Sequence, residues 1–199
     1  MRDVAIKEIV NVMQQKGVEF SKIRALDFFA REGDWQTFYY ANLVSEIHAW
    51  EIDPTCEESL RNNLPLGAKI VIGDSHELAK SCNEKFDMIV LDNPQGCYGT
   101  GYCEHFDALG VIFPLLSDRS LLIFNVKVKP FNYEDKLEWQ RRRNEFYGKD
   151  ASELDVYFIH EFYESLLKTH GFDVEFSFVT ERPHEEGLVA YAAKLLRMH

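Results

Sequence analysis

Apolar residues near the start of the chain recur with helical spacing. They stand at positions i, i+3, i+4 and i+7, as Ile6, Ile9, Val10 and Met13. This spacing places the four side chains on one face of a helix. Gly17 follows, and glycine commonly ends a helix because it readily adopts a left-handed conformation. The pattern therefore predicts an amphipathic helix that stops near Gly17.

Short apolar runs then alternate with longer amphipathic ones up to residue 126. The short runs predict strands at 23–29, 46–51, 68–72, 86–91 and 120–126. The longer runs predict helices at 35–43, 54–63, 76–82 and 106–116. An alternation of strands and helices is typical of a parallel sheet with helices on both faces and right-handed crossovers.

The last part of the chain follows a different pattern. A long helix predicted at 152–169 ends at Gly171, and two strands are expected at 173–179 and 188–195. Only a turn-like segment separates these strands, so they must pair antiparallel. We therefore predict an α/β fold with a single three-layer, Rossmann-like domain over residues 1–199. Its sheet should be seven-stranded and mostly parallel, with a C-terminal antiparallel hairpin.

Composition narrows the class of protein. Hydrophobic residues make up 46% and charged residues 28% of the chain, which is typical of a globular protein. The apolar runs are far shorter than the roughly 20 residues that span a bilayer, and the first ten residues lack the apolar core of a signal peptide. We therefore expect a cytoplasmic protein without membrane contact. The net charge of −11 argues against general nucleic-acid affinity, because phosphate would be repelled.

Two local features bear on binding. Residues 127–149 carry seven Lys/Arg against four acids, and the run QRRRNEF lies beside Trp139. This run either holds phosphate or forms a solvated helix face. The four cysteines are unevenly spaced, and we expect free thiols. Cys97, Cys103 and His105 lack a fourth ligand at a zinc-site spacing, so no metal is expected.

Ligands of an open parallel sheet bind beyond the carboxyl ends of its strands, and the first such end carries a motif. Residues 26–37 read LDFFAREGDWQT. A tight turn here lets backbone N–H groups and a helix N-terminus approach a ligand. The stretch resembles the LDLFAGTG form of the first S-adenosylmethionine (AdoMet)-binding motif in class I AdoMet-dependent methyltransferases that act on nucleic acids. The matching positions are Asp27, Phe28, Phe29, Ala30 and Gly33.

The resemblance implies that AdoMet is the cofactor. It implies that Asp27 organises the turn and reaches the methionine ammonium group. The other residues that it places at the ligand are Phe29, Ala30, Glu32 and Gly33. Arg31 stands where the family usually has its first glycine, and a side chain at that position is expected to crowd the turn.

The next two strand ends add polar residues. Glu51 ends the second predicted strand, and a carboxylate there can accept hydrogen bonds from both ribose hydroxyls, with Ile52 packed on the adenine. Asp74 and Ser75 follow the third strand, where the family contacts the adenine amino group. Asp74 is equally suited to capping the helix that follows.

The fourth strand runs into FDMIVLDNPQGCYG, which resembles the (Asp/Asn)-Pro-Pro-aromatic motif of amino-methyltransferases. Its four positions hold Asp92, Asn93, Pro94 and Gln95. In that family the first residue and a backbone carbonyl hold the target amino group in line with the methyl group, so the reaction depends mainly on alignment. Gln95 replaces the aromatic residue, and Tyr98 could supply the stacking face. The Asn-Pro pair is also typical of a plain turn.

Residues 95–105 follow this motif and contain three glycines and two tyrosines. Such a segment is suited to a lid over a site. Glu104, His105 or Asp107 could act there as a general base, although a lone histidine more often just begins a helix.

The resemblance spans about residues 23–195 and favours a methyltransferase that acts on an amino nitrogen. The acceptor would be a nucleic-acid base, which must be extruded from a duplex, or a small molecule. A partner protein or a homodimer could present it. One alternative is a non-catalytic AdoMet-binding or regulatory module with the same fold. A dinucleotide-dependent oxidoreductase would need Gly-x-Gly-x-x-Gly, which residues 29–33 do not supply.

Overall fold

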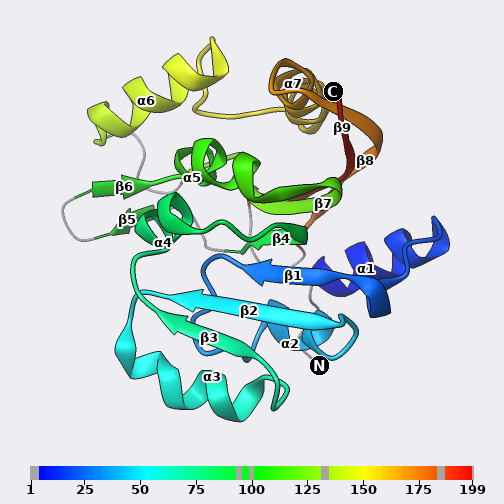
Figure 1. Ribbon diagram of the computed structural model, residues 1–199. Helices are drawn as coiled ribbons and strands as arrows, with labels where there is room; N and C mark the ends of the chain where they lie inside the picture. Colours follow the sequence, from blue (N-terminus) through cyan, green and yellow to red (C-terminus); the bar gives the residue numbers. More distant parts are fainter. Residues whose placement is uncertain (1–4, 93–95, 99–100, 131–134, 183–186, 199) are drawn as a thin grey trace.

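A computed structural model describes residues 5–92, 96–98, 101–130, 135–182 and 187–198. A seven-stranded sheet forms its centre, in the order β3-β2-β1-β4-β7-β9-β8 (Figure 1). Its strands are β1 (Arg24–Asp27), β2 (Glu46–Glu51), β3 (Lys69–Ile72), β4 (Phe86–Leu91), β7 (Leu116–Lys127), β8 (Phe172–Glu181) and β9 (Leu188–Arg197). The strands from β3 to β7 pair in parallel, as the alternating sequence pattern predicts.

The C-terminal hairpin is arranged as predicted. β9 lies between β7 and β8 and pairs antiparallel with both. β8 consequently runs parallel to β1 and β4, and its carboxyl end reaches the same edge of the sheet as theirs. β7 begins at Leu116 rather than at the predicted position 120, because residues 117–119 are polar, and 118 and 119 are exposed, so no apolar run marks the start of the strand.

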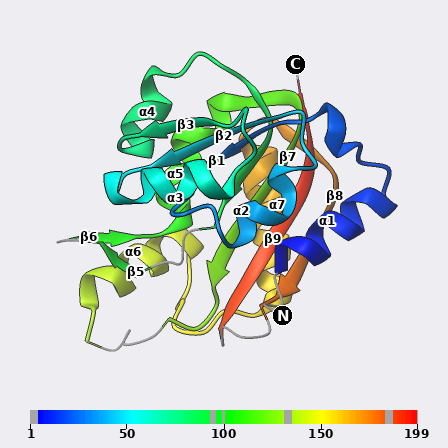
Figure 2. The same cartoon turned by 90° about the horizontal axis from the view of Figure 1, so that it is seen from below.

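Helices cover both faces of the sheet. They are α1 (Ala5–Gln15), α2 (Gln36–Ala41), α3 (Glu57–Asn63), α4 (Ser75–Ser81), α5 (His105–Ile112), α6 (Leu137–Tyr147) and α7 (Val156–Thr169), with short 3₁₀ turns η1 (Phe20–Lys22), η2 (Pro54–Cys56) and η3 (Phe113–Leu115). Side chains of α1, α2 and α3 share one buried cluster, and those of α4, α5 and α7 share the other. Figure 2 shows α1, α2 and α3 in front of the strands. The predicted three layers are confirmed.

Local sequence explains where the helices end. The apolar face of α1 is buried, and Gly17 beyond it has φ +84°, the left-handed conformation that favours glycine. α7 starts later than predicted, because the Asp155 side chain accepts hydrogen bonds from two backbone N–H groups and caps the helix. It ends before Gly171, which has φ +83°.

Two elements were not predicted as such. A small antiparallel hairpin of β5 (Gly96–Tyr98) and β6 (Gly101–Cys103) lies within the segment predicted to be a lid loop. Such three-residue strands are too short for an alternating pattern to reveal them. α6 contains the basic run, and its Gly148 C-cap has φ +68°.

Candidate active site

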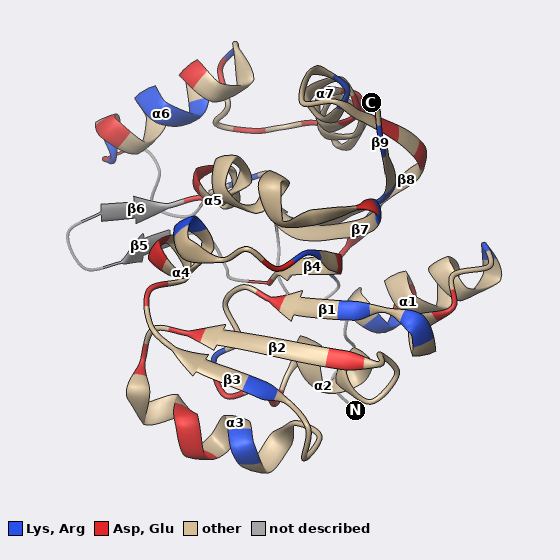
Figure 3. Cartoon of the chain, viewed as in Figure 1, with Lys and Arg blue, Asp and Glu red and all other residues tan. Residues whose placement is uncertain are grey.

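Three acids end neighbouring strands at the carboxyl edge of the sheet. Asp27 is the last residue of β1, Glu51 is the last of β2, and Asp92 directly follows β4. β1 pairs with β2 on one side and β4 on the other, so the strand order reverses at this point. Open α/β sheets bind ligands beside such a switch point. In Figure 3 acidic residues colour the tips of the β1 and β2 arrows red.

Asp27 is buried in a network of hydroxyl groups. Its Oδ2 atom accepts hydrogen bonds from Thr37 Oγ1 at 2.5 Å and from the Tyr40 hydroxyl at 2.7 Å, both on α2. Its Oδ1 atom accepts a longer bond from the Phe29 N–H at 3.4 Å. Burial raises the pKa of the Asp27 carboxyl, although the hydroxyl donors oppose this shift. Asp27 therefore fixes α2 and the intervening turn to the end of β1.

In the turn after β1, a residue other than glycine has the left-handed backbone conformation that favours glycine. Arg31 has φ +50° and an exposed side chain, while Gly33 has φ +66°. A β-carbon at Gly33 would lie 3.1 Å from side-chain atoms of Leu60 and Leu64, so both conformation and packing require glycine there. The Arg31 side chain is exposed, and the expected crowding of the turn stays a prediction from the sequence.

Glu51 holds this turn from the adjacent strand. Its Oε2 atom accepts a hydrogen bond from the Arg31 N–H at 2.6 Å, and its Oε1 atom accepts one from the Asp53 N–H at 2.9 Å. A carboxylate has about four lone-pair positions, so each oxygen can accept another donor. The Ala30 N–H also donates to the Trp50 carbonyl at 2.9 Å. The β1 turn is thus bound along the end of β2.

Apolar and aromatic side chains flank these acids. Ile52 is 57% exposed directly after Glu51. The rings of Phe29 and His76 lie 6.0 Å apart, between centroids. Asp74 caps α4 by accepting hydrogen bonds from the backbone N–H groups of His76 and Glu77, which is the capping role predicted as one alternative. Ser75 is buried at the start of the same helix.

A pocket opens between the β1 turn and the end of β4. Its cavity volume is small, about 20 Å³. Its lining residues are Phe29, Ala30, Arg31, Asp34, Trp35, Gln36, Thr37 and Asp92. The predicted residues of two separate motifs therefore meet at one concave surface. Glu32 is exposed beside it, and the Glu32 carbonyl accepts a hydrogen bond from Asn63 at 2.8 Å.

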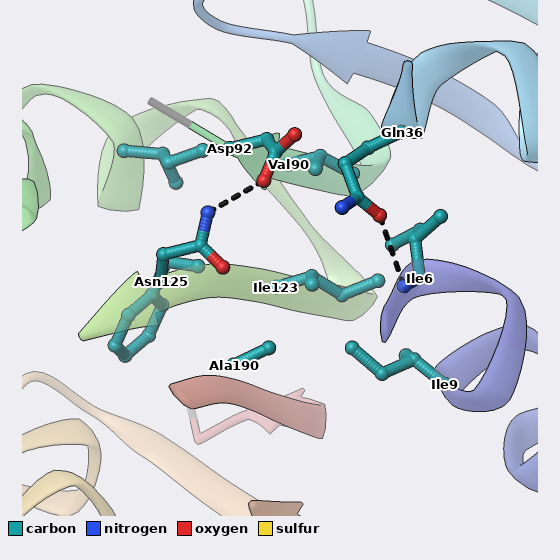
Figure 4. Close-up of a pocket in the computed structure, with 10 residues that line it drawn as sticks. Ile6, Ile9, Gln36, Val90, Asp92, Ile123, Asn125 and Ala190 are labelled. Atoms are coloured by element: carbon teal, nitrogen blue, oxygen red, sulfur yellow. Dashed lines mark hydrogen bonds between the residues drawn. The ribbon is translucent and has the colours of Figure 1, made fainter. Parts of the chain in front are cut away.

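Asp92 is held by residues that the sequence reasoning missed. Its Oδ1 atom accepts hydrogen bonds from Asn125 Nδ2 at 2.5 Å and from Arg182 Nη1 at 2.9 Å. Asn125 lies on β7, next to β4, and faces the same small pocket beneath α1 as Asp92 (Figure 4). The Arg182 guanidinium also lies 4.9 Å from the centroid of the Trp35 ring.

One signal could have found Arg182. The predicted hairpin leaves β8 parallel to β1, so the residue after β8 must reach the carboxyl edge of the sheet. The turn that contains Arg182 was interpreted only as a connection. Gln36 was also missed, and its Oε1 atom accepts a hydrogen bond from the Ile6 N–H of α1 at 3.0 Å (Figure 4).

The remaining predicted catalytic residues cannot be placed as side chains. Asn93 and Pro94 lie outside the described residues, as does Gln95. Tyr98 belongs to β5 by its backbone, and its side chain lies outside the described part.

The basic run forms the solvated helix face only in part. Arg143 is fully buried, and its Nη1 atom lies 2.6 Å from Glu104 Oε1. Trp139 Nε1 donates to the same carboxylate oxygen at 2.7 Å. Arg141, Asn144 and Glu145 fit the solvated helix face, since all three are exposed, and Arg141 pairs with Glu138 and Glu145. Glu104 thus anchors α6 and does not face an open site as a general base.

The two other candidate bases are also engaged. His105 is buried, its ring nitrogen lies in hydrogen-bond contact with the Tyr163 hydroxyl, and burial lowers its pKa. Asp107 closes a capping box by accepting the Glu104 N–H at 2.8 Å, and it pairs with Arg142. His105 and Asp107 therefore serve the packing and capping of α5.

The strand order, with its single antiparallel strand, is that of the Rossmann-like methyltransferase fold. No family model and no curated protein sequence matches the chain. TYW2 from M. jannaschii, solved with AdoMet, is 17% identical with a TM-score of 0.56, over 96% of this chain and 77% of that one. Trm5b from Pyrococcus abyssi is 16% identical with a TM-score of 0.54, over 97% of this chain and 49% of that one.

The M. jannaschii tRNA m1G37 methyltransferase is 13% identical with a TM-score of 0.56, over 96% of this chain and 49% of that one. These likenesses establish the fold.

Among the described residues, no helix is long and apolar enough to cross a membrane. A cytoplasmic location, and a partner protein or second copy, stay predictions from the sequence.

Proposed function

We propose that this chain is an AdoMet-dependent methyltransferase that acts on an amino nitrogen of a nucleic-acid base or a small molecule. The observation that carries this proposal is the meeting of Asp27, Glu51 and Asp92 at three adjacent strand ends beside the switch point. The Arg31 backbone adds to it, because it keeps the left-handed turn that the cofactor motif requires.

The residues at the carboxyl edge fit an adenosyl ligand. Glu51 retains acceptor capacity for the ribose hydroxyls, although each oxygen accepts one backbone N–H. Ile52 offers an exposed apolar surface for adenine, with Asp74 and Ser75 assigned to the adenine edge. Asp27 braces the turn through Thr37 and Tyr40. The cofactor-binding set that we propose is Asp27, Phe29, Ala30, Glu32, Gly33, Glu51, Ile52, Asp74 and Ser75.

The chemistry needs mainly alignment. Bound AdoMet would supply the methyl group on a sulfonium that departs as a neutral thioether, and the acceptor nitrogen would release its proton to water. Asp92 lines the pocket at the β1 turn and is proposed to accept a hydrogen bond from the target amino group. Asn93, Pro94 and Tyr98 are proposed to complete the acceptor side.

The fold neighbours support nucleic acid as one acceptor class, since one is a tRNA methyltransferase. The opposing consideration is the net charge of −11, which repels phosphate. A small-molecule acceptor therefore stays part of the proposal. The non-catalytic alternative would retain AdoMet binding without transfer.

The test is methyl transfer from AdoMet labelled in its methyl group. Purified protein is incubated with separate pools of RNA, DNA, protein and small metabolites, and incorporated label is measured. We expect label in one pool and inhibition of its incorporation by S-adenosylhomocysteine (AdoHcy). AdoMet binding without incorporation into any pool would favour the non-catalytic module.

A further inference from the structure

A polar cluster joins α7 to the edge strand β8 and shares no residue with the candidate active site. His160 and Glu164 stand on α7, and Ser177 stands on β8. The Ser177 Oγ atom lies 2.7 Å from His160 Nε2 and donates a hydrogen bond to Glu164 Oε1 at 2.6 Å. The two α7 residues are four positions apart, so their side chains project from the same face of the helix. Three potential ligand atoms therefore converge.

The spacing of these atoms fits a single metal ion. His160 Nε2 and Glu164 Oε1 lie 3.7 Å apart. Zinc binds histidine nitrogen and carboxylate oxygen at about 2.0–2.2 Å, so two ligands of one ion can lie up to about 4.2 Å apart. The observed separation is within this limit. The two side chains are 36% and 33% exposed, which leaves them accessible to an ion and to water.

A buried hydroxyl beside the cluster is an independent sign of a missing partner. Tyr191 on β9 is fully buried, and its hydroxyl has no hydrogen-bond partner among the described residues. Tyr191 pairs with Val179 and Ser177 pairs with Ala193, so Tyr191 and Ser177 are diagonal neighbours on one face of the sheet. The His160 and Tyr191 rings lie 6.3 Å apart, between centroids. Buried polar groups normally have a partner, and ordered water is a common one.

The ligand atoms favour one class of cation. Mg²⁺ and Ca²⁺ are bound by oxygen ligands, whereas imidazole nitrogen suits zinc, nickel, copper and iron. His160 can supply such a nitrogen when Nε2 carries no proton. Glu164 adds a negative charge, and the Ser177 hydroxyl adds a neutral oxygen. This mixed set is suited to a zinc-like ion better than to magnesium.

We propose that His160, Glu164 and Ser177 form a binding site for one zinc-like divalent cation. Water completes the coordination and gives the Tyr191 hydroxyl its missing partner. The ion ties α7 to β8 and so stabilises the edge of the sheet. This site is separate from the proposed methyl transfer and does not depend on it.

The test is calorimetric titration of tag-free protein with Zn²⁺ and, separately, with Mg²⁺ at pH 7.5. We expect the wild type to bind Zn²⁺ at this site and not Mg²⁺. His160→Gln and Glu164→Gln should each weaken Zn²⁺ binding at least about tenfold, the lower end of the effect of removing even an outer-shell partner. Ser177→Ala should weaken it less, because a neutral hydroxyl is the poorest of the three ligands.

Two matched controls come from the same part of the chain. Glu161 is exposed on α7, and His170 is exposed directly after this helix. Glu161→Gln and His170→Gln should therefore keep the wild-type affinity for Zn²⁺. A second readout is thermal unfolding. Zn²⁺ at about 100 times its dissociation constant should raise the Tm of the wild type and both controls by roughly 5 °C.

The same Zn²⁺ concentration should leave the Tm of His160→Gln and Glu164→Gln nearly unchanged. Each of these variants removes a different ligand, so either tests the proposal if the other does not fold. The proposal would be overturned by a wild type that binds no Zn²⁺, or by His160→Gln and Glu164→Gln that bind it as tightly as the wild type. Neither result would bear on methyl transfer.

Discussion

Asp27 and Asp92 end adjacent parallel strands, yet they are held in opposite ways. Asp27 is buried among the neutral hydroxyls of Thr37 and Tyr40, and burial raises its pKa. Asp92 faces a pocket and pairs with the cation of Arg182. The same strand-end geometry therefore serves two purposes. One acid braces the turn that follows it, and the other pairs with a cation at the wall of a pocket.

Removal of the bracing acid should have the largest effect on stability. Asp27→Ala leaves the buried Thr37 and Tyr40 hydroxyls without their acceptor, at a cost of about 3 kcal/mol in the free energy of unfolding. Asp92→Asn keeps an oxygen acceptor but takes its negative charge away from the enclosed Arg182 guanidinium, which should cost about 2 kcal/mol. Urea denaturation measures both. A loss below about 1 kcal/mol in Asp27→Ala would contradict its bracing role.

Removal of the pocket-facing acid should instead affect the reaction. Asp92→Asn is expected to slow methyl transfer roughly 100-fold, the usual scale for loss of one positioned polar group in an active site. Its affinity for uncharged AdoHcy should change less than about threefold. The measurement combines the labelled transfer assay with calorimetry. Asp118→Asn, at the opposite edge of the sheet, is the matched control, and full activity in Asp92→Asn would show that the chemistry lies elsewhere.

The turn that Asp27 braces contains two positive-φ residues with different constraints. Gly33→Ala should cost about 2 kcal/mol, because a left-handed conformation is unfavourable for alanine and its β-carbon would press on Leu60 and Leu64. Arg31→Gly should be neutral or stabilising by up to about 1 kcal/mol, because it relieves φ +50°. Thermal unfolding compares the two. A large loss in Arg31→Gly would mean that the Arg31 side chain stabilises the turn.

The smallest expected effect is a pH dependence that belongs to Asp27 alone. Burial raises its folded pKa above an unfolded value of about 3.9. Between these two values the folded state binds more protons than the unfolded state, so the free energy of unfolding falls as the pH rises. Asp27→Asn does not titrate and should lack this contribution. Wild-type stability should therefore decline relative to Asp27→Asn as the pH rises from about 4, and a constant difference would contradict the shift.

The sequence predicted the fold well because the fold depends on periodicity. Buried parallel strands such as β4 appear as continuous apolar runs, and β2 has the predicted bounds. The short connection between β8 and β9 required an antiparallel pair, which the structure confirms. The β5–β6 hairpin escaped because its strands have three residues each, too few for any period.

The candidate site was predicted only in part, because its contacts cross large separations in the sequence. Strand ends identified Asp27, Glu51 and Asp92 one at a time. No local pattern reveals that Arg182, 90 positions from Asp92, forms an ion pair with it. Arg143 was missed for the same reason. It belongs to a basic run that the sequence places on the surface, but it is buried against Glu104, which is distant in the sequence.

The most direct test of the central claim is calorimetric titration of the wild type and Glu51→Ala with AdoMet, AdoHcy and NAD. Glu51 joins the β1 turn to the end of β2 and is the proposed partner of the ribose hydroxyls. We predict that the wild type binds both adenosyl ligands and not NAD, and that Glu51→Ala weakens them at least about tenfold. Wild-type protein that binds neither AdoMet nor AdoHcy would contradict the account.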